Sequence, residues 1–352
     1  ILINQSFIEQ YRRMTEIQGQ DATEVLAAAE AHNRQDHDVF NDNVLPGPMT
    51  VAEREVLPQR FHETVRQAYR DLLEEVGAEM PPSPAELAQR LEQARSRFLG
   101  QMLAKDVDDQ LTQEEQQQLR DELAKVRLGE YSRVADRIRF YASFETLNPP
   151  FWDQSYELSM TELYDWQWRY WITEDILQAL ADANREAGSV ATAPVKRLVS
   201  ITIEDQVAPA AAGGSGGRGG RGGGAPPAPT PPNPKTEVKR DFAVSLTGRL
   251  TNPLYDVRRV TLELIVSAER YPFVIDALAR QNFITVLDMD LEPADPYEEI
   301  RQGFFYGSEP VYRMTLQLET IWLRSWTSQF MPQEVRQMLG VPEPQPEAPP
   351  AG

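Results

Sequence analysis

The stretch Val260-Thr-Leu-Glu-Leu-Ile-Val-Ser267 decides the fold class of this chain. Val260, Leu262, Leu264 and Val266 occupy every second position, with the polar residues Thr261 and Glu263 between the first three of them. A period of two places alternate side chains on opposite faces of a strand, and one apolar face is typical of an antiparallel sheet covered by helices on one side. Similar alternation occurs in Phe242–Leu250, Phe283–Leu291 and Met314–Trp322. The sequence therefore predicts an antiparallel sheet with one buried face.

The segments around this stretch predict the order of the elements. We expect, in chain order, helix 162–187, strand 197–205, strand 238–250, strand 258–268, helix 270–281, strand 283–291 and strand 311–324. Helices would then cover one face of an antiparallel sheet, which is the α+β, ferredoxin-like arrangement. In this arrangement the strands at 197–205 and 238–250 lie side by side.

A glycine run at Gly213–Gly224 and a proline tract at Pro226–Pro234 separate those two strands. Glycine has no side chain to bury and loses the most backbone entropy on ordering, so the run cannot support packed structure. Proline stiffens the second part into an extended spacer. Loop closure grows only logarithmically with length, so a long insertion costs little stability. We expect residues 207–235 to be a disordered insertion inside one module.

The first half of the chain is predicted to be helical. Capping boxes, in which a Ser or Thr caps a helix and a Glu three residues later reaches back, start helices at Thr50, Ser83 and Thr112. Pro58 should kink or restart the first of these. The segment Ser6–Ala31 is rich in Gln, Glu and Ala, and such helices form coiled coils, hairpins or stalks.

Three regions follow from these assignments. Residues 1–143 would form a helical stalk and helical insertion, and residues 144–330 a ferredoxin-like module. Residues 331–352 would form a short helix and a disordered, proline-rich tail.

The predicted helix 162–187 is unusually aromatic, which leaves two interpretations open. Its aromatic residues could pack on the sheet, with the excess covered by the N-terminal helices. They could instead form a binding surface, since Trp and Tyr are enriched among interface anchors. On the second interpretation the candidate interface residues are Trp166, Trp168, Tyr170, Trp171 and Trp322.

Composition restricts the partners. The 352 residues carry a net charge of -19, which argues against broad contact with nucleic acid or anionic lipid, because both are polyanions. The chain has no cysteine, so disulfides and thiolate metal sites are excluded. No apolar run reaches about 18 residues, the length of a membrane span. Because residue 1 is Ile, we expect a trimmed chain; Ile1–Phe7 would be either the end of a removed anchor or the apolar side of an ordinary helix.

Several motifs match catalytic or metal-binding patterns without the context that the chemistry needs. Gly213–Gly217 and Gly217–Gly222 match the nucleophile-elbow and dinucleotide patterns, but no strand runs into them and no helix follows. His32 and His37 are five residues apart, which does not place two imidazoles on one helix face, so we expect structural or surface roles. Asp106–Asp109 resembles the start of a calcium loop, but Leu111 occupies the glycine position.

Two further features have simple explanations. Arg218 and Arg221 are too few for an RNA-binding Arg-Gly-Gly segment, so a linker is expected. Asp288, Asp290 and Glu292 alternate along a strand and predict a solvated edge. We therefore expect no catalytic residue, no cofactor, no metal site and no nucleic-acid partner, and a protein that is not an enzyme.

Three segments carry a resemblance to a known family: Tyr271-Pro-Phe-Val-Ile-Asp-Ala-Leu278, Phe283-Ile-Thr-Val-Leu287 and Tyr312-Arg-Met-Thr-Leu-Gln-Leu318. A short helix feeding a strand, a final alternating strand and an N-terminal stalk together resemble the ectodomains of PilO. PilO, PilN and the M component of type II secretion are inner-membrane alignment proteins. The resemblance is architectural and covers roughly residues 1–30 and 162–326. The long helical insertion, the aromatic helix and the glycine-proline segment depart from it.

The resemblance implies a scaffold without catalytic residues in a pilus or secretion inner-membrane complex. Its partners would be a related ectodomain, in a homodimer or heterodimer, and other envelope assembly proteins. Its location would be the bacterial inner membrane with a periplasmic ectodomain, if an anchor precedes Ile1, and membrane contact would be through that anchor alone. The alternative is a soluble, cytoplasmic adaptor that binds partners through its helical half or its tail Pro342–Pro350.

Overall fold

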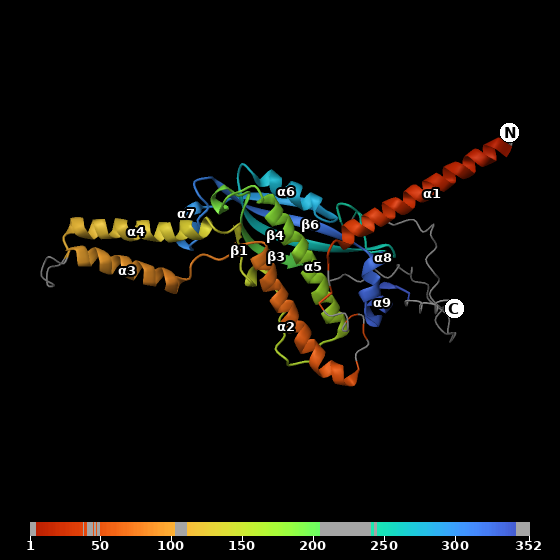
Figure 1. Cartoon of the computed structure of the whole chain (residues 1–352), viewed down its shortest axis with the longest axis horizontal. Helices are drawn as coiled ribbons and strands as arrows, with labels where there is room; N and C mark the ends of the chain where they lie inside the picture. Colours follow the sequence, from red (N-terminus) through yellow and green to blue (C-terminus); the bar gives the residue numbers. More distant parts are fainter. Residues whose placement is uncertain are drawn as a thin grey trace, which may run out of the picture.

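The computed structural model of the chain describes residues 5–37, 39–40, 45, 47, 50–102, 111–204, 241–242 and 245–342. A central α/β body carries two helical projections at opposite ends (Figure 1). One projection is the single helix α1 (Gln5–Arg34), and the other is the hairpin of α3 (Pro84–Met102) and α4 (Gln113–Ala135).

One six-stranded sheet forms the centre of the body, in the order β1-β2-β3-β4-β6-β5. Its four long strands pair antiparallel, as the alternating pattern predicts. They are β3 (Val195–Ile203), β4 (Tyr255–Ser267), β5 (Ile284–Pro293) and β6 (Val311–Leu323). Two short strands from the helical half, β1 (Ala78–Glu79) and β2 (Phe140–Tyr141), extend the sheet in parallel, so the sheet is mixed at this edge.

The predicted strand at 238–250 is wrong. The neighbour of β3 is β4, with Leu198 opposite Leu264. Residues 238–240 and 243–244 lie outside the described residues, and Ser245–Leu250 form a turn in which Gly248 has a φ of 66°. The alternating polar side chains of this turn do not face solvent, because Ser245 and Thr247 donate hydrogen bonds to Glu319 on β6 at 2.9 and 2.8 Å.

The predicted helices are present and begin at their capping residues. Thr50, Thr112 and Ser159 cap α2 (Val51–Glu75), α4 and α5 (Met160–Ala183) with complete capping boxes. Ser83 makes the equivalent hydrogen bonds with Glu86 at the start of α3. The helix α2 continues through Pro58 without a restart. The shorter helices are α6 (Tyr271–Arg280), α7 (Pro296–Arg301), α8 (Arg324–Thr327) and α9 (Gln333–Leu339).

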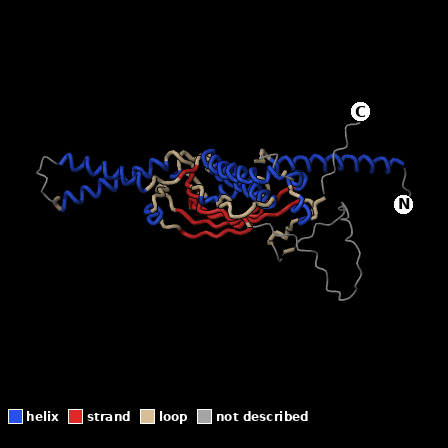
Figure 2. Tube along the Cα trace, turned by 90° about the horizontal axis from the view of Figure 1, so that it is seen from below, coloured by secondary structure: helices blue, strands red, loops and turns tan. Residues whose placement is uncertain are grey.

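Helices cover one face of the sheet (Figure 2). The helices α5 and α6 pack on it, and α2 packs on α5 from outside, so that α5 lies between two layers. This position explains why apolar residues surround α5 on all sides, since a helix that is hydrophobic all round is buried. The main core lies between α5 and the inward side chains of the long strands.

A second, smaller core lies at the β1–β2 end of the sheet. Val134 at the end of α4 and Ile138 just after it pack there with Tyr141, Ile265 and Phe304. This core holds the base of the α3–α4 hairpin against the body. Since β1 and β2 belong to the sheet, the sheet crosses the boundary that we predicted at residue 143.

Candidate functional site

The five aromatic residues predicted as an interface lie inside the body. Trp168, Trp171 and Trp322 are fully buried, and Trp166 is 8% exposed. Tyr170 is half-buried, with its ring 4.6 Å from that of Phe40 and 5.4 Å from that of Tyr69 on α2. The interface interpretation is therefore wrong for these residues. The layer of α2 and the C-terminal helices covers α5, so its aromatic residues form core contacts.

These rings are part of a buried aromatic cluster that links α5 to the end of the sheet. Trp171 stacks on Trp322 of β6 at 6.1 Å between ring centroids, and it lies 5.2 Å from Trp326 of α8. The His37 ring lies 5.5 Å from Trp322 and 6.2 Å from Trp326. The imidazole of His37 thus packs among three indole rings, those of Trp171, Trp322 and Trp326.

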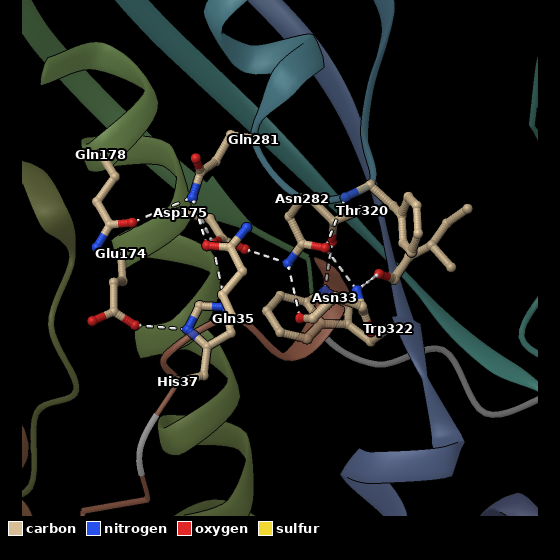
Figure 3. Close-up of polar contacts among 12 residues, drawn as sticks. Asn33, Gln35, His37, Glu174, Asp175, Gln178, Gln281, Asn282, Thr320 and Trp322 are labelled. Carbon is tan, nitrogen blue, oxygen red and sulfur yellow. Dashed lines mark hydrogen bonds and ion pairs between the residues drawn. The ribbon is translucent and has the colours of Figure 1, made fainter. Parts of the chain in front are cut away.

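A polar cluster, which we call the α1 seat, lies beside these rings (Figure 3). It consists of Asn33, His37, Glu174, Asp175 and Asn282, contributed by the end of α1 and the segment after it, by α5, and by the junction of α6 and β5. All of these side chains except Glu174 are buried. The α1 seat is the point at which the N-terminal helix joins the body.

Asn33 is the most fully bonded member of the α1 seat. Its amide donates to Asn282 Oδ1 and to the carbonyl of Ile321, both at 2.7 Å. Its Oδ1 accepts from the peptide N–H of Leu323 at 2.6 Å and from the indole N–H of Trp326 at 2.8 Å. A side-chain amide has two N–H donors and one oxygen that can accept two hydrogen bonds, so the Asn33 side chain makes all the hydrogen bonds that it can.

His37 binds two carboxylates of α5. Its Nδ1 lies 2.8 Å from Glu174 Oε2, and its Nε2 lies 3.3 Å from Asp175 Oδ1. Burial lowers the pKa of His37, but hydrogen bonds and charge interactions with Asp175 and Glu174 outweigh burial and raise that pKa to about 9. The imidazole is therefore protonated at neutral pH, and its positive charge balances the buried carboxylate of Asp175.

Asn282 closes the α1 seat from the side of the sheet. It donates to Asp175 Oδ2 at 2.7 Å and accepts from the Phe283 peptide N–H at 2.7 Å. Its φ of 48° turns the chain from α6 into β5, a left-handed conformation that asparagine adopts more readily than most residues. The side-chain amide of Gln281 donates hydrogen bonds to Gln35 Oε1 at 3.0 Å and to Asp175 Oδ1 at 3.2 Å.

The interactions of the α1 seat attach α1 to the body. Its polar atoms bind one another and the backbone, and the surrounding indoles exclude water, which strengthens each contact. Among the described residues, no group of three or more His, Cys, Asp or Glu side chains is arranged to hold a metal ion. The calcium-like Asp106–Asp109 and the glycine motifs at 213–222 lie outside the described residues.

The helix α1 itself is exposed along its length, in contrast to its seat. Asn33 is the buried residue of its 30 residues. Tyr11, Met14, Val25 and Leu26 are 61%, 53%, 67% and 69% exposed. No helix among the described residues is both long and apolar enough to cross a membrane.

The remaining predicted sites take surface positions. His32 is exposed, with its ring 5.1 Å from that of Phe283. Asp288, Asp290 and Glu292 are exposed on β5, which is an edge strand, as predicted. The segments that carry the PilO resemblance form α6, β5 and β6, and the last two are neighbours in the sheet.

Sequence reasoning did not find the α1 seat. Asn33 and Asn282 are 249 residues apart, so no local pattern joins them. One local signal was present in the sequence. Asn282 stands directly between the predicted helix 270–281 and the predicted strand 283–291, and an Asn in such a place is a candidate for a left-handed turn.

No family model matches the chain, and no curated protein sequence matches it. Structure comparison finds solved structures that match, among them three from Akkermansia muciniphila. A crystal structure from this organism is 11% identical, with a TM-score of 0.25, and the match covers 77% of this chain and 95% of that one. A core-domain crystal structure is 9% identical, with a TM-score of 0.25, over 76% and 100% of the two chains. The third structure, which lacks its transmembrane region, is 10% identical, with a TM-score of 0.24, over 73% and 96%. At these TM-scores the similarity establishes neither a shared fold nor a shared function.

Proposed function

We propose that this protein is a non-enzymatic scaffold that self-associates through α1, in a bacterial cell-envelope assembly of the pilus or secretion type. One observation carries the proposal. The helix α1 is fixed to the body by the hydrogen bonds of Asn33 in the α1 seat, while the surface before its last turns, including large apolar side chains, is exposed.

A partner helix explains this combination better than a free helix does. Isolated helices are marginal in water, and most helical stability in proteins comes from packing of an apolar face. Tyr11, Met14 and Val25 lie in one line along α1, because residues three, four, seven or eleven positions apart share a helix face. Their exposed fractions of 61%, 53% and 67% leave this line available for packing.

The α1 seat supports the same function from the side of the body. A flexible link would be enough if α1 only connected the body to another segment. Instead the last turn of α1 is held by Asn33 and the following segment by His37, so the direction of α1 relative to the sheet is fixed. A fixed direction is what a scaffold needs in order to place its bodies at a set spacing.

The assignment to the cell envelope depends on the architecture. The order α5-β3-β4-α6-β5-β6 after an N-terminal helix is the helix–strand–strand repeat that resembles PilO ectodomains. The net charge of -19 suits a protein that avoids nucleic acid and works through protein partners.

Sedimentation equilibrium tests the self-association, with two neighbouring substitutions as a matched pair. Val25→Glu places a charge on the line of Tyr11 and Met14, whereas Leu26→Glu places it about 100° around the helix axis, at a similar exposure. We expect Val25→Glu to weaken the dimer about tenfold or more and Leu26→Glu to leave it nearly unchanged. A chain that stays monomeric at every soluble concentration, or equal effects of both variants, would refute the proposal.

Cell fractionation tests the envelope assignment separately. The protein expressed from its own gene should be found with the membrane fraction and should cross-link to components of an envelope assembly. Recovery in the soluble cytoplasmic fraction, with folded cytosolic partners, would support the adaptor alternative instead.

A further inference from the structure

We propose that α1 pairs in antiparallel orientation with α1 of a second copy of this chain, in the register that places Gln18 opposite Asp21 of that copy. This inference rests on the proposed self-association and adds its geometry.

The exposed residues of α1 fit a seven-residue repeat. Position a is occupied by Tyr11, Gln18, Val25 and His32, and position d by Phe7, Met14, Asp21 and Ala28. Positions a and d form the contact line of two supercoiled helices. Met14, Val25 and Ala28 are exposed in this structure, so the middle of the line is accessible.

Most charged residues of α1 lie away from this line, with Asp21 at a d position and Glu24 at a g position as the exceptions. Of the eight charged side chains of α1, six lie at positions b, c and f, which face away from a partner: Glu9, Arg12, Arg13, Glu16, Glu30 and Arg34. The e positions, which flank the line, carry Ile8, Thr15, Ala22 and Ala29 and no charge. A helix that is solvated on all sides has no reason to segregate its charges in this way.

The antiparallel register follows from the size and polarity of the a and d residues. In an antiparallel pair each a residue meets a d residue of the other helix. When Gln18 meets Asp21, Met14 meets Val25, Tyr11 meets Ala28, and Phe7 meets His32. Tyr11 then faces the small Ala28, and the carboxylate of Asp21 meets the amide donor of Gln18.

The parallel alternative is less favourable for a definite reason. In a parallel pair each residue meets its own copy, so Asp21 would face Asp21 across the contact line. Placing two like charges against each other in a partly desolvated contact is unfavourable. Tyr11 would also face Tyr11 where the antiparallel pair offers the small Ala28.

The body leaves room for this partner. The last turn of α1 buries Asn33 and half-buries Ala29 and Glu30, whereas Ala28 and His32 on the contact line remain exposed. Ala29, Glu30 and Asn33 therefore face the body from a side of α1 other than the contact line, and the contact line meets the body at His32, whose ring lies 5.1 Å from that of Phe283. The pair is closed by a two-fold axis, so it forms a dimer and does not extend into a fibre.

Disulfide cross-linking tests the orientation cleanly, because the chain has no cysteine. Met14→Cys and Val25→Cys are prepared as separate proteins, mixed while reduced, and oxidised. We expect the mixture to form the disulfide-linked heterodimer, and each variant alone to remain unlinked. Leu26→Cys, at an outward position of similar exposure to Val25, is the matched control and should link with neither.

The possible results separate the orientation from the self-association itself. Efficient linking of Val25→Cys to itself would show a parallel pair and overturn this inference, while the proposed self-association would stand. No linking in any mixture, together with monomeric sedimentation of the unmodified chain, would overturn both.

A charge substitution gives a second test that does not depend on cysteine. Gln18→Lys would place an ammonium group opposite Asp21 twice in the antiparallel dimer, and two surface ion pairs should tighten it about fivefold. Gln18→Glu should weaken it by a similar factor. In a parallel dimer the introduced lysine would face its own copy, so weakening by Gln18→Lys would refute the antiparallel register.

Discussion

Two long helices of this molecule, α5 and α1, are stabilised in opposite ways. The helix α5 has 24 residues, of which fourteen are buried, whereas α1 has 30 residues and buries one. The helix α5 lies between the sheet and α2, so tertiary packing maintains it. The helix α1 is held at one end by a polar seat and extends away from the body (Figure 1).

This difference shows that the length of a helix says little about its role. The residues of α5 are interior residues of the fold, and changing them should affect folding. The residues of α1 before the α1 seat belong to a surface, and changing them should affect association. The following predictions test this division, from the largest expected effect on stability to the smallest.

Trp168→Ala should destabilise the body by about 3–5 kcal/mol, the usual loss for a fully buried aromatic side chain. The indole is fully buried, and the Arg258 guanidinium lies 4.5 Å above it, so the substitution also uncovers a buried charge. Urea unfolding followed by far-UV circular dichroism measures this loss. A change below about 1 kcal/mol would mean that α5 is not the centre of the fold.

Stability should fall as the pH rises from about 6.5 to about 9, because of His37. Its folded pKa of about 9 lies above the ordinary value of 6.5, so its contribution is complete below about pH 6.5 and is lost as the pH passes the folded pKa. The shift corresponds to about 3 kcal/mol. Unfolding of the chain and of His37→Gln at several pH values should show this slope in the former alone.

Lys196 provides an opposing contribution at higher pH. Burial lowers its pKa to about 8, so the protonated form is disfavoured in the folded state. The cost of holding this charge in the folded state is relieved as the pH rises above 8, so the free energy of unfolding increases there. Lys196 is present in both proteins, so the difference between the chain and His37→Gln isolates His37. An equal pH slope in the two would contradict the buried ion pair.

Asn33→Ala should cost about 2 kcal/mol and should loosen α1 from the body. It removes the acceptor of two N–H groups, from Leu323 and Trp326, and leaving a buried donor unpaired costs about 1–3 kcal/mol before water enters. Hydrogen exchange should become faster at Leu323 while the amides of β4 stay protected. Unchanged exchange at Leu323 would show that Asn33 does not hold the junction.

Leu26→Ala should change the unfolding free energy by less than about 0.5 kcal/mol, since Leu26 is 69% exposed. The same substitution at Leu180 of α5, which is fully buried, should cost about 2–5 kcal/mol. The two variants, Leu26→Ala and Leu180→Ala, compare the same substitution in α1 and in α5. Equal losses of unfolding free energy in the two variants would contradict the division between a surface helix, α1, and an interior helix, α5.

Local patterns predicted most of the fold. The capping residues Thr50, Ser83 and Thr112 start helices because a cap depends on residues three positions away. Alternation in Val260–Val266 predicted β4 because a half-buried strand imposes a period of two. These signals are local, and they need no knowledge of what the element packs against.

The errors and omissions have nonlocal causes. The segment 245–250 alternates as a strand does, but its polar residues face Glu319 and Gly248 turns the chain. The strand β1 has two residues, too few for any period. The α1 seat joins α1, α5 and the α6–β5 junction, which are far apart in sequence, so its members looked like ordinary polar residues.

The described residues on either side of the long glycine- and proline-rich segment lie at one place on the sheet. The peptide N–H of Glu204 donates to the carbonyl of Arg259 at 3.0 Å, and Thr247 binds Glu319, the cross-strand partner of Arg259. Glu204 and Thr247, which stand on either side of residues 205–240 in the sequence, are therefore already held together by the sheet. A polypeptide cut within this segment should yield two fragments that reassemble without a covalent link, because β3 on one fragment and β4 on the other pair antiparallel from Val195 to Ile203. The protein is in this sense a natural candidate for fragment complementation, and a reporter or affinity module inserted at the same point would leave the sheet intact.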